Sequence, residues 1–226
     1  GLRSSGYEGS DYPWHGALVY GDHVYDHIRY RARGGVWRYS LGKNHPKIDF
    51  NRGHDFQAYD DYGVPYKTKW RKLNLSAVIQ HGDRLHRGEQ GMFESTGFRL
   101  FNLSGVEGPL THFVHFRTIT RGEERPPGAD LENQYLTDFQ GLYLAIEQMD
   151  GRFLDEHDMP DGNLYKMEGG TGELNSQGAY AATDKSDLNG FIFGYYDRTP
   201  TEEWWRAAVD LQHYYSYRSI IEAIHH

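Results

Sequence analysis

The chain has 226 residues, of which 38% are hydrophobic, 15% aromatic and 25% charged. This composition is typical of a globular protein and excludes a largely disordered one. The chain contains no cysteine, which excludes disulfides, thiolate catalysis and cysteine-based zinc sites. Because no run of about 18 apolar residues occurs, the sequence predicts no membrane span.

The net charge of −8 is unevenly distributed along the chain. Residues 1–100 carry 15 Lys and Arg against 11 Asp and Glu, a charge of +4, whereas residues 101–226 carry 9 against 21, a charge of −12. A basic first half and an acidic second half can form a cleft with one wall that binds an anion and another that binds cations. Two separate surfaces of opposite charge would explain the same charge distribution. Because acidic residues are interleaved with the basic ones, we expect no nucleic-acid binding.

The first predicted elements are extended strands. Ile28, Tyr30 and Ala32 alternate with arginines between residues 25 and 38, and the segment KIDF at residues 47–50 predicts a partner strand. The tip between them holds two glycines and several cations: Arg33, Gly34, Gly35, Arg38 and Lys43. Glycines let a backbone approach phosphate oxygens, which Arg and Lys neutralise. A simple turn explains the same residues, because neither GxGxxG nor GxxxxGK[ST] occurs.

The middle of the chain contains a predicted helix between predicted strands. Residues 70–79 have an extended pattern, and residues 87–105 have the spacing of a helix. Residues 111–120 alternate and residues 141–150 are almost continuously apolar, so both predict strands of an antiparallel sheet.

Two acidic residues in this part are candidates for a site. Glu94, on the predicted helix, can orient a strand lysine such as Lys43 or Lys47 toward a nucleotide, or can be an ordinary surface carboxylate. Glu147 interrupts the apolar run GLYLAIEQMD. Because a buried carboxylate costs free energy unless it is paired, Glu147 predicts a partner such as a buried arginine.

The last third of the chain begins with a predicted short helix at residues 150–159. A strand follows within DGNLYKMEGG, and its Lys166 faces either water or an anion. Residues 169–187 are rich in Gly, Ser, Thr and Asn and predict an irregular stretch. The strongest helical pattern covers residues 201–226, which Thr201 can cap. The histidines lack the spacing of zinc ligands, so no metal site is predicted from them.

Five segments of the chain, RARGG, KNHPKIDF, RGEQGMF, GLYLAIEQMDGRFLDE and GNLYK, follow one another in a specific order. Together they resemble the CotH (spore coat protein H) kinase family, an atypical branch of the protein-kinase-like fold. The likeness covers roughly residues 25–170. Its most specific stretch is residues 141–166, where a strand, a short helix and GNLYK follow one another as in the family.

The resemblance implies a protein-kinase-like α+β fold. Residues 1–24 would be an N-terminal extension, residues 25–150 an antiparallel sheet with a helix that binds the nucleotide, and residues 151–226 the start of a mostly helical C-lobe. The implied activity is transfer of the γ-phosphoryl group of ATP, with Mg²⁺ or Mn²⁺, to Ser or Thr of a protein acceptor. The implied nucleotide-binding residues are Arg33, Gly34, Arg38, Lys43, Lys47, Glu94, Glu147 and Lys166.

The family's catalytic and metal-binding aspartates follow the helix that ends here at His226. The resemblance therefore predicts that these aspartates lie beyond His226 and that the chain by itself is close to inactive. The alternative function is a catalytically inactive surface, adhesion or ligand-binding module with a kinase-like fold. The family implies an extracellular location or one at a bacterial cell or spore surface, and a cytoplasmic location stays open.

Overall fold

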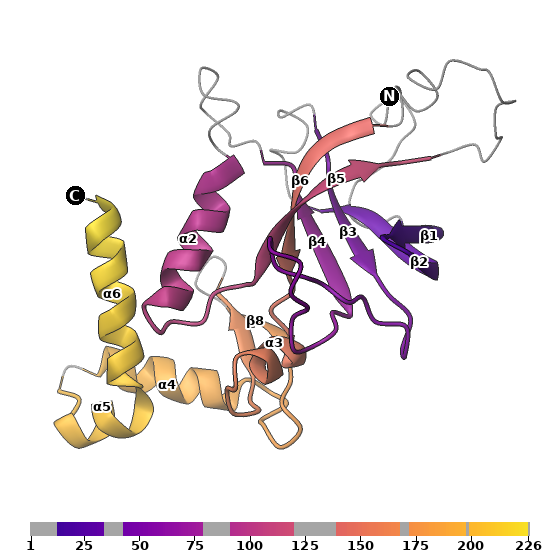
Figure 1. The fold of residues 1–226 in the computed structure, drawn as a ribbon. Coiled ribbons are helices and arrows are strands. Elements are labelled where there is room, and N and C mark those ends of the chain that lie inside the picture. Colours follow the sequence, from indigo (N-terminus) through magenta and orange to yellow (C-terminus); the bar gives the residue numbers. More distant parts are fainter. Residues whose placement is uncertain are drawn as a thin grey trace, which may run out of the picture.

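The computed structural model describes residues 13–33, 43–78, 91–119, 139–167, 172–197 and 199–225. It has a mixed α+β fold, in which a curled antiparallel sheet of six strands lies beside several helices (Figure 1). The strands are β1 (Trp14–Tyr20), β2 (His23–Arg33), β3 (His45–Asp49), β4 (Lys72–Ser76), β5 (Thr111–Arg117) and β6 (Phe139–Glu147). Their order across the sheet is β1-β2-β3-β4-β6-β5.

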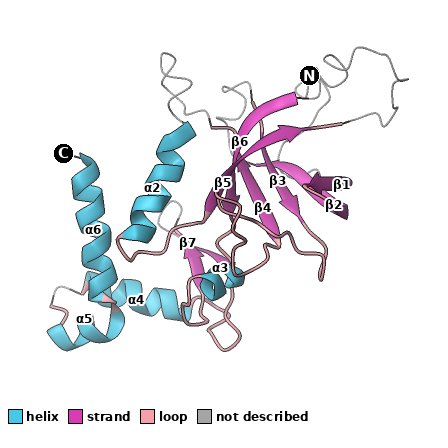
Figure 2. Cartoon of the chain, viewed as in Figure 1, coloured by secondary structure: helices cyan, strands magenta, loops and turns pink. Residues whose placement is uncertain are grey.

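A second, two-stranded sheet and the helices follow the six-stranded sheet along the chain, apart from α2, which lies between β4 and β5 (Figure 2). The small sheet pairs β7 (Leu164–Lys166) with β8 (Glu173–Ser176). The helices are α2 (Gly91–Leu103), α3 (Gly151–Glu156), α4 (Ser186–Tyr196), α5 (Glu202–Ala208) and α6 (Leu211–His225). Within the described ranges, no helix is both long and apolar enough to cross a membrane.

The strands and the helix predicted between residues 25 and 150 are confirmed, with ends that differ by a few residues. Strand β1 lies within residues 1–24, the range assigned above to an N-terminal extension. It pairs with β2 in antiparallel register, with Trp14 opposite Tyr30. The sheet therefore begins before the boundary that the resemblance implied.

One face of the six-stranded sheet, which we call the core face, carries the hydrophobic core. Period-two alternation brings apolar residues of neighbouring strands to this face, as in the paired Ile48 and Leu73. The buried members of the core are Ile28, Ile48, Phe50, Phe56, Ala58, Trp70, Leu73, Leu75, Ala77, Tyr143 and Ala145. The sheet is therefore held mainly by burial of large side chains on one side.

The long loop between β3 and β4 covers the core face. Phe56 and Trp70 form an antiparallel bridge, with N–H···O distances of 2.9 and 2.8 Å. Tyr66 stacks on Trp70 with ring centroids 5.8 Å apart, and its hydroxyl donates to the carbonyl of Thr111 at 3.0 Å. The loop is thus anchored to β5 on the far side of the core.

The irregular stretch predicted over residues 169–187 is corrected in part, because it contains strand β8 and the first two residues of helix α4. The helix begins at Ser186, where the Asp184 carboxylate accepts the Ser186 N–H at 3.0 Å. Phe191 of α4 stacks on Trp204 of α5 with centroids 6.0 Å apart. Packing of aromatic rings between helices therefore outweighs the low helix propensity of the glycines in this segment.

The single C-terminal helix predicted over residues 201–226 is wrong, because the chain forms two helices there. Thr201 caps α5 as expected, and its hydroxyl accepts the Trp204 N–H at 3.1 Å. Val209 then adopts an extended backbone, with φ −134° and ψ 130°. The Asp210 carboxylate accepts the His213 N–H at 3.1 Å and so begins α6 as a new helix.

The segment DGNLYKMEGG is organised by Asn163, whose amide joins three parts of the chain. Its nitrogen donates to the Ala182 carbonyl and to Asp187, both at 2.8 Å, and its oxygen accepts the Gly178 N–H at 3.1 Å. Gly178 packs so closely on Gly162 that a β-carbon at Gly178 would lie 2.8 Å from the Gly162 Cα. Hydrogen bonds and close backbone packing of this segment therefore connect the start of β7 with the start of α4.

We expect Gly178→Ala to lower the free energy of unfolding by about 1–3 kcal/mol, because the backbone of Gly162 cannot move aside as a flexible side chain can. Gly190→Ala is the matched control, since a β-carbon there meets nothing within 4 Å and Gly190 lies inside α4. The control should gain about 0.5–1 kcal/mol. Urea unfolding measures both, and equal effects of the two substitutions would contradict the close packing.

Helix α6 contacts α2 and the loop that follows α2. Phe101 stacks on Tyr217 with centroids 5.7 Å apart, and Nε2 of His213 lies 3.1 Å from a Glu107 oxygen. Nδ1 of the same ring lies 2.7 Å from an Asp210 oxygen. Neutral imidazole has only one N–H, so both contacts are hydrogen bonds only when His213 is protonated.

We expect an NMR titration to give His213 a pKa above 6.5, raised by the carboxylates of Asp210 and Glu107. Because the folded pKa is raised, the stabilisation is complete below about pH 6.5 and is lost as the pH rises through the folded value. Asp210→Asn and Glu107→Gln should each move the pKa back toward 6.5. A value at or below 6.5 in the unmodified protein would show that the two contacts are not ionic.

Candidate anion-binding site

The face of the sheet opposite the core carries polar side chains, and we call it the polar face. Arg31 pairs with Lys47, and Lys47 pairs with Asn74, so these three residues form one row across β2, β3 and β4. Directly paired residues of antiparallel strands point to the same side. By the same register, Arg33 and His45 form the next row toward the end of the sheet.

Lys47 is the centre of this face. Its Nζ donates to Oε1 of Gln148 at 2.8 Å, and the same oxygen accepts from Nδ2 of Asn74 at 3.1 Å. Burial, followed by the charges of Lys72 and Arg31, lowers the pKa of Lys47 to about 8. A bound anion would offset both the burial and the repulsion, so the geometry suits a phosphate or a similar group.

Arg33 and His45 lie in the row beside Lys47, and Arg33 adds a further cation to the polar face. Burial lowers the pKa of the Arg33 guanidinium, and the charge of Glu94 in the first turn of α2 raises it. Nδ1 of His45 accepts the Ala77 N–H at 3.1 Å, and burial and nearby cations lower the pKa of His45. His45 is therefore neutral at pH 7, with its proton on Nε2.

Glu94 was expected to orient Lys43 or Lys47, and its electrostatic partner in the structure is Arg33. Lys43 instead donates to the backbone carbonyls of Ala77, at 3.2 Å, and of Leu142. Its Nζ also lies 4.0 Å from the centroid of the Tyr143 ring. Lys43 thus fastens the ends of β4 and β6 together, which leaves Lys47 as the better candidate for an anion.

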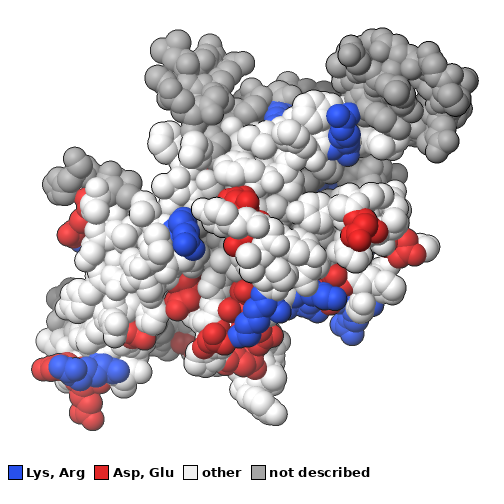
Figure 3. Space-filling model, viewed as in Figure 1, with Lys and Arg blue, Asp and Glu red and all other residues white. Residues whose placement is uncertain are grey.

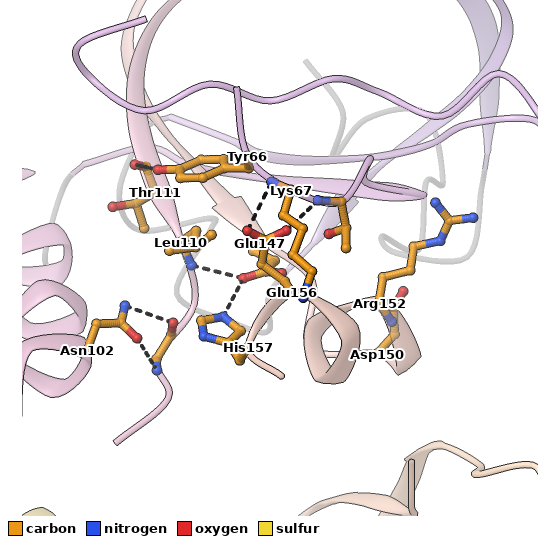
Figure 4. A network of polar contacts seen from close by, with 12 residues as sticks. Tyr66, Lys67, Asn102, Leu110, Thr111, Glu147, Asp150, Arg152, Glu156 and His157 are labelled. Atoms are coloured by element: carbon orange, nitrogen blue, oxygen red, sulfur yellow. Dashed lines mark hydrogen bonds and ion pairs between the residues drawn. The ribbon is translucent and has the colours of Figure 1, made fainter. Parts of the chain in front are cut away.

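Glu147 lies on the core face and not on the polar face, because it pairs with Leu73. Its side chain is 2% exposed, and its Oε2 lies 3.1 Å from both the Leu110 N–H nitrogen and Nε2 of His157 (Figure 4). Burial raises the pKa of Glu147, and the hydrogen bonds from His157 and Leu110 oppose this rise. The predicted buried carboxylate with a partner is confirmed, but the partner is a histidine and not an arginine.

Short polar contacts fix α3 to the loop over the core, directly after Glu147 (Figure 4). Arg152 donates to the Lys69 carbonyl at 2.6 Å and pairs with Asp55 at 2.9 Å. Glu156 accepts the backbone N–H groups of Lys67, at 3.2 Å, and of Thr68, at 2.5 Å. These contacts and the Glu147–His157 pair hold the end of β6, where Gln148 is positioned to meet Lys47.

The remaining candidates lie elsewhere. Lys166 is an exposed residue of β7 in the separate two-stranded sheet. Gly34 and Arg38 lie outside the described residues. Of the candidates that the structure describes, Arg33 and Lys47 thus lie on the polar face. The negative charge of Glu94 acts on Arg33 and raises its pKa.

Sequence reasoning missed the neutral groups that position Lys47. These groups are the amides of Asn74 and Gln148. Oε1 of Gln148 accepts hydrogen bonds from both Lys47 and Asn74. Their signal in the sequence is a polar residue within or just after an apolar strand, as in KLNLS and YLAIEQ. That signal becomes specific only with the strand register, which places them beside Lys47.

The acidic and basic groups are mixed on the surface where α3 meets the loop over the core. Figure 3 shows Lys and Arg beside Asp and Glu in this region, and two of its ion pairs are Lys67–Asp158 and Arg152–Asp55. Among the described residues, no group of three or more His, Asp or Glu could hold a metal ion. The cations of the polar face, and not this mixed surface, are therefore the candidate for binding an anion.

The comparisons with known proteins identify no relative. No protein-family model matches the chain, and no curated protein sequence matches it. The candidate site is a cationic surface on the polar face of the curled sheet, formed by Arg31, Arg33 and Lys47, and it suits an anionic ligand.

Proposed function

We propose that the chain is the nucleotide-binding part of an atypical protein kinase of the CotH type, and that its polar face binds the phosphates of ATP. The observation that carries this proposal is Lys47, a lysine of lowered pKa that is flanked by Arg31 and Lys72 and held by an amide oxygen of Gln148. The Asp49 carboxylate raises the pKa of Lys47 but does not cancel the effects of burial and of the neighbouring cations, so a further anion would be favourable here.

The arrangement of elements supports the same proposal. Protein kinases bind ATP on a sheet that supplies a lysine, and a carboxylate from a neighbouring helix approaches that lysine. Here α2 is the next described element after β4 and contacts β5 and β6, and its Glu94 interacts with a cation of the polar face. The cation is Arg33 and not a lysine, so the pairing is a variant of the kinase arrangement.

The proposed reaction is transfer of the γ-phosphoryl group of ATP to Ser or Thr of a protein acceptor at a bacterial cell or spore surface. The chain's own part in it is to bind and orient the phosphates with Lys47, Arg31 and Arg33. Because the described residues contain no metal-ligand group, we derive no step through Mg²⁺ or Mn²⁺. The cations around Lys47 equally support a second candidate, a module that binds a nucleotide or another anion without phosphoryl transfer.

Two measurements separate these functions. Calorimetric titration with ATP, with and without Mg²⁺, tests binding, and we expect saturable binding in at least one condition. Incubation with γ-labelled ATP, Mg²⁺ or Mn²⁺ and a Ser/Thr-rich protein tests transfer. Binding without label on either protein would support the non-catalytic module, whereas no saturable binding in either condition would rule out both nucleotide-based functions.

A further inference from the structure

A cavity of about 200 Å³ lies at the end of the curled sheet that is remote from Glu147. The residues around it are at the start of β1, the end of β2, the start of β3, the end of β5 and the start of β6. The walls are mainly aromatic and aliphatic, and they include Trp14, Tyr30, Phe116 and Tyr143. A cavity at the mouth of a closed or curled sheet, lined by aromatic rings with a few polar groups, is a common form of ligand site.

The aromatic walls are held in place by contacts of their own. Trp14 stacks on Tyr30 with centroids 5.5 Å apart and an interplanar angle of 24°. Phe116 meets Tyr143 edge to face at 5.3 Å, and the Tyr143 hydroxyl donates to the Asn44 carbonyl at 3.0 Å. A ligand that enters would therefore meet rings that are already oriented, which lowers the entropy cost of binding.

Apart from Arg31, the polar part of the lining is neutral. It consists of two amides and a hydroxyl, from Asn44, Gln140 and Thr118, and it contains no carboxylate. The one charged residue at the cavity is Arg31, which pairs with Lys47 and so belongs to the polar face. The lining thus suits a neutral molecule that has an apolar face for the rings and hydroxyl groups for the amides.

We propose that this cavity binds one neutral sugar ring of a glycan. A pyranose ring has C–H faces that pack on Trp and Tyr, and hydroxyls that exchange hydrogen bonds with Asn, Gln and Thr. At about 200 Å³ the cavity is smaller than sites for drug-sized ligands, which are roughly 300–1,000 Å³, so one ring enters and the rest of the glycan stays outside.

A glycan site at this place shares Arg31 with the proposed nucleotide site, but its aromatic walls are separate from Lys47. Tyr30 and Tyr143 belong to the core face, whereas Lys47 is on the opposite face of the sheet. Glycan binding that depends on Trp14 should therefore persist in saturating ATP. The two proposals can accordingly succeed or fail separately in experiments on the same protein.

Saturation-transfer NMR on the full chain tests the proposal with methyl glycosides of glucose, galactose, mannose and N-acetylglucosamine. We expect transfer to the ring protons of at least one of them, and at least a tenfold loss of affinity in Trp14→Ala. Trp205→Ala is the matched control, because Trp205 lies on α5, and it should leave binding unchanged. Near-UV circular dichroism checks the fold of each variant.

Gln140→Ala provides a second variant that should fold normally, since Gln140 is exposed at the start of β6. We expect it to weaken binding about three- to tenfold by removing one amide from the rim. No transfer to any of the four glycosides, or equal losses in Trp14→Ala and Trp205→Ala, would overturn the proposal. Trp14-dependent binding of N-acetyltyrosinamide without sugar binding would also overturn it, and would assign the cavity to an aromatic side chain.

Discussion

Replacing Lys47 with methionine should weaken ATP binding about 10- to 100-fold. Methionine keeps most of the length of the side chain and removes its charge, and a hydrogen bond to a charged group contributes about 1.5–3 kcal/mol. The loss should appear as a higher dissociation constant in calorimetric titrations at pH 7. The Gln148 oxygen that Lys47 contacts still receives the Asn74 amide, so the polar face should keep its shape.

Lys69→Met is the matched control for this substitution. Lys69 is an exposed lysine of the loop over the core, and the contact that fixes its position uses its backbone carbonyl, which accepts from Arg152. Its replacement removes the same charge from a different place and should change ATP affinity less than twofold. If both substitutions weakened binding equally, the effect would reflect net charge, and the polar face would not be the site.

The pH dependence of ATP binding gives a second view of Lys47. Its pKa in the free protein is about 8, and a bound polyanion raises that value. The contribution of Lys47 to affinity is therefore complete below about pH 8 and falls as the pH rises, by up to about tenfold per pH unit. Lys47→Arg keeps its charge throughout this range and should flatten the profile between pH 8 and 9. A profile that is equally steep in Lys47→Arg would show that another group titrates.

The strands of the sheet could be predicted because their signal is local. Alternation in the segment from Tyr25, in KIDF and in THFVHFR has a period of two, and the apolar run GLYLAIE extends over a whole buried strand. The start of α4 and the break between α5 and α6 at Val209 could not be predicted from the sequence, because both depend on contacts between residues that are distant in the sequence. The glycines of α4 disfavour a helix, and the stacking of Phe191 on Trp204 of α5 provides stabilisation that the local sequence does not.

The candidate site was predictable in residue type but not in geometry. Lys47 and Glu147 were both selected from the sequence, yet they point to opposite faces of one sheet. Their sides are determined by register, since Lys47 pairs with Asn74 and Glu147 pairs with Leu73. The alternation in KIDF already suggests that Lys47 points away from the side of Ile48, whereas the continuous apolar run GLYLAIE does not show to which face Glu147 points.

Removing the imidazole of His157 should lower the free energy of unfolding by about 3 kcal/mol, because it leaves the Glu147 carboxylate buried without its partner. The side chains of Glu147 and His157 are 2% and 9% exposed, so water replaces little of the lost interaction. Urea unfolding of His157→Ala at pH 7 measures the change. Glu222→Gln is the control, because it breaks an exposed pair with Arg218 on α6 and should cost at most about 0.5 kcal/mol.

A variant with both Glu147→Gln and His157→Ala tests whether the loss comes from the charge. The amide of glutamine still accepts the Leu110 N–H, and a neutral group needs no charged partner. The double variant should therefore lose less free energy of unfolding than the two single variants lose in sum, and the difference should be at least about 1 kcal/mol. Additive effects would mean that His157 contributes by packing against Phe153 alone.

The pH dependence of the His157→Ala variant distinguishes the same alternatives without a second substitution. Burial raises the pKa of Glu147 and His157 lowers it, so the variant should have a still higher pKa for this carboxyl. A carboxyl whose folded pKa is raised favours folding in its protonated form, and that advantage is lost as the pH rises through the folded pKa. The stability deficit of the variant should consequently be largest at pH 7 and shrink as the pH falls toward the pKa of Glu147. A packing defect at Phe153 would instead give a deficit that does not change with pH.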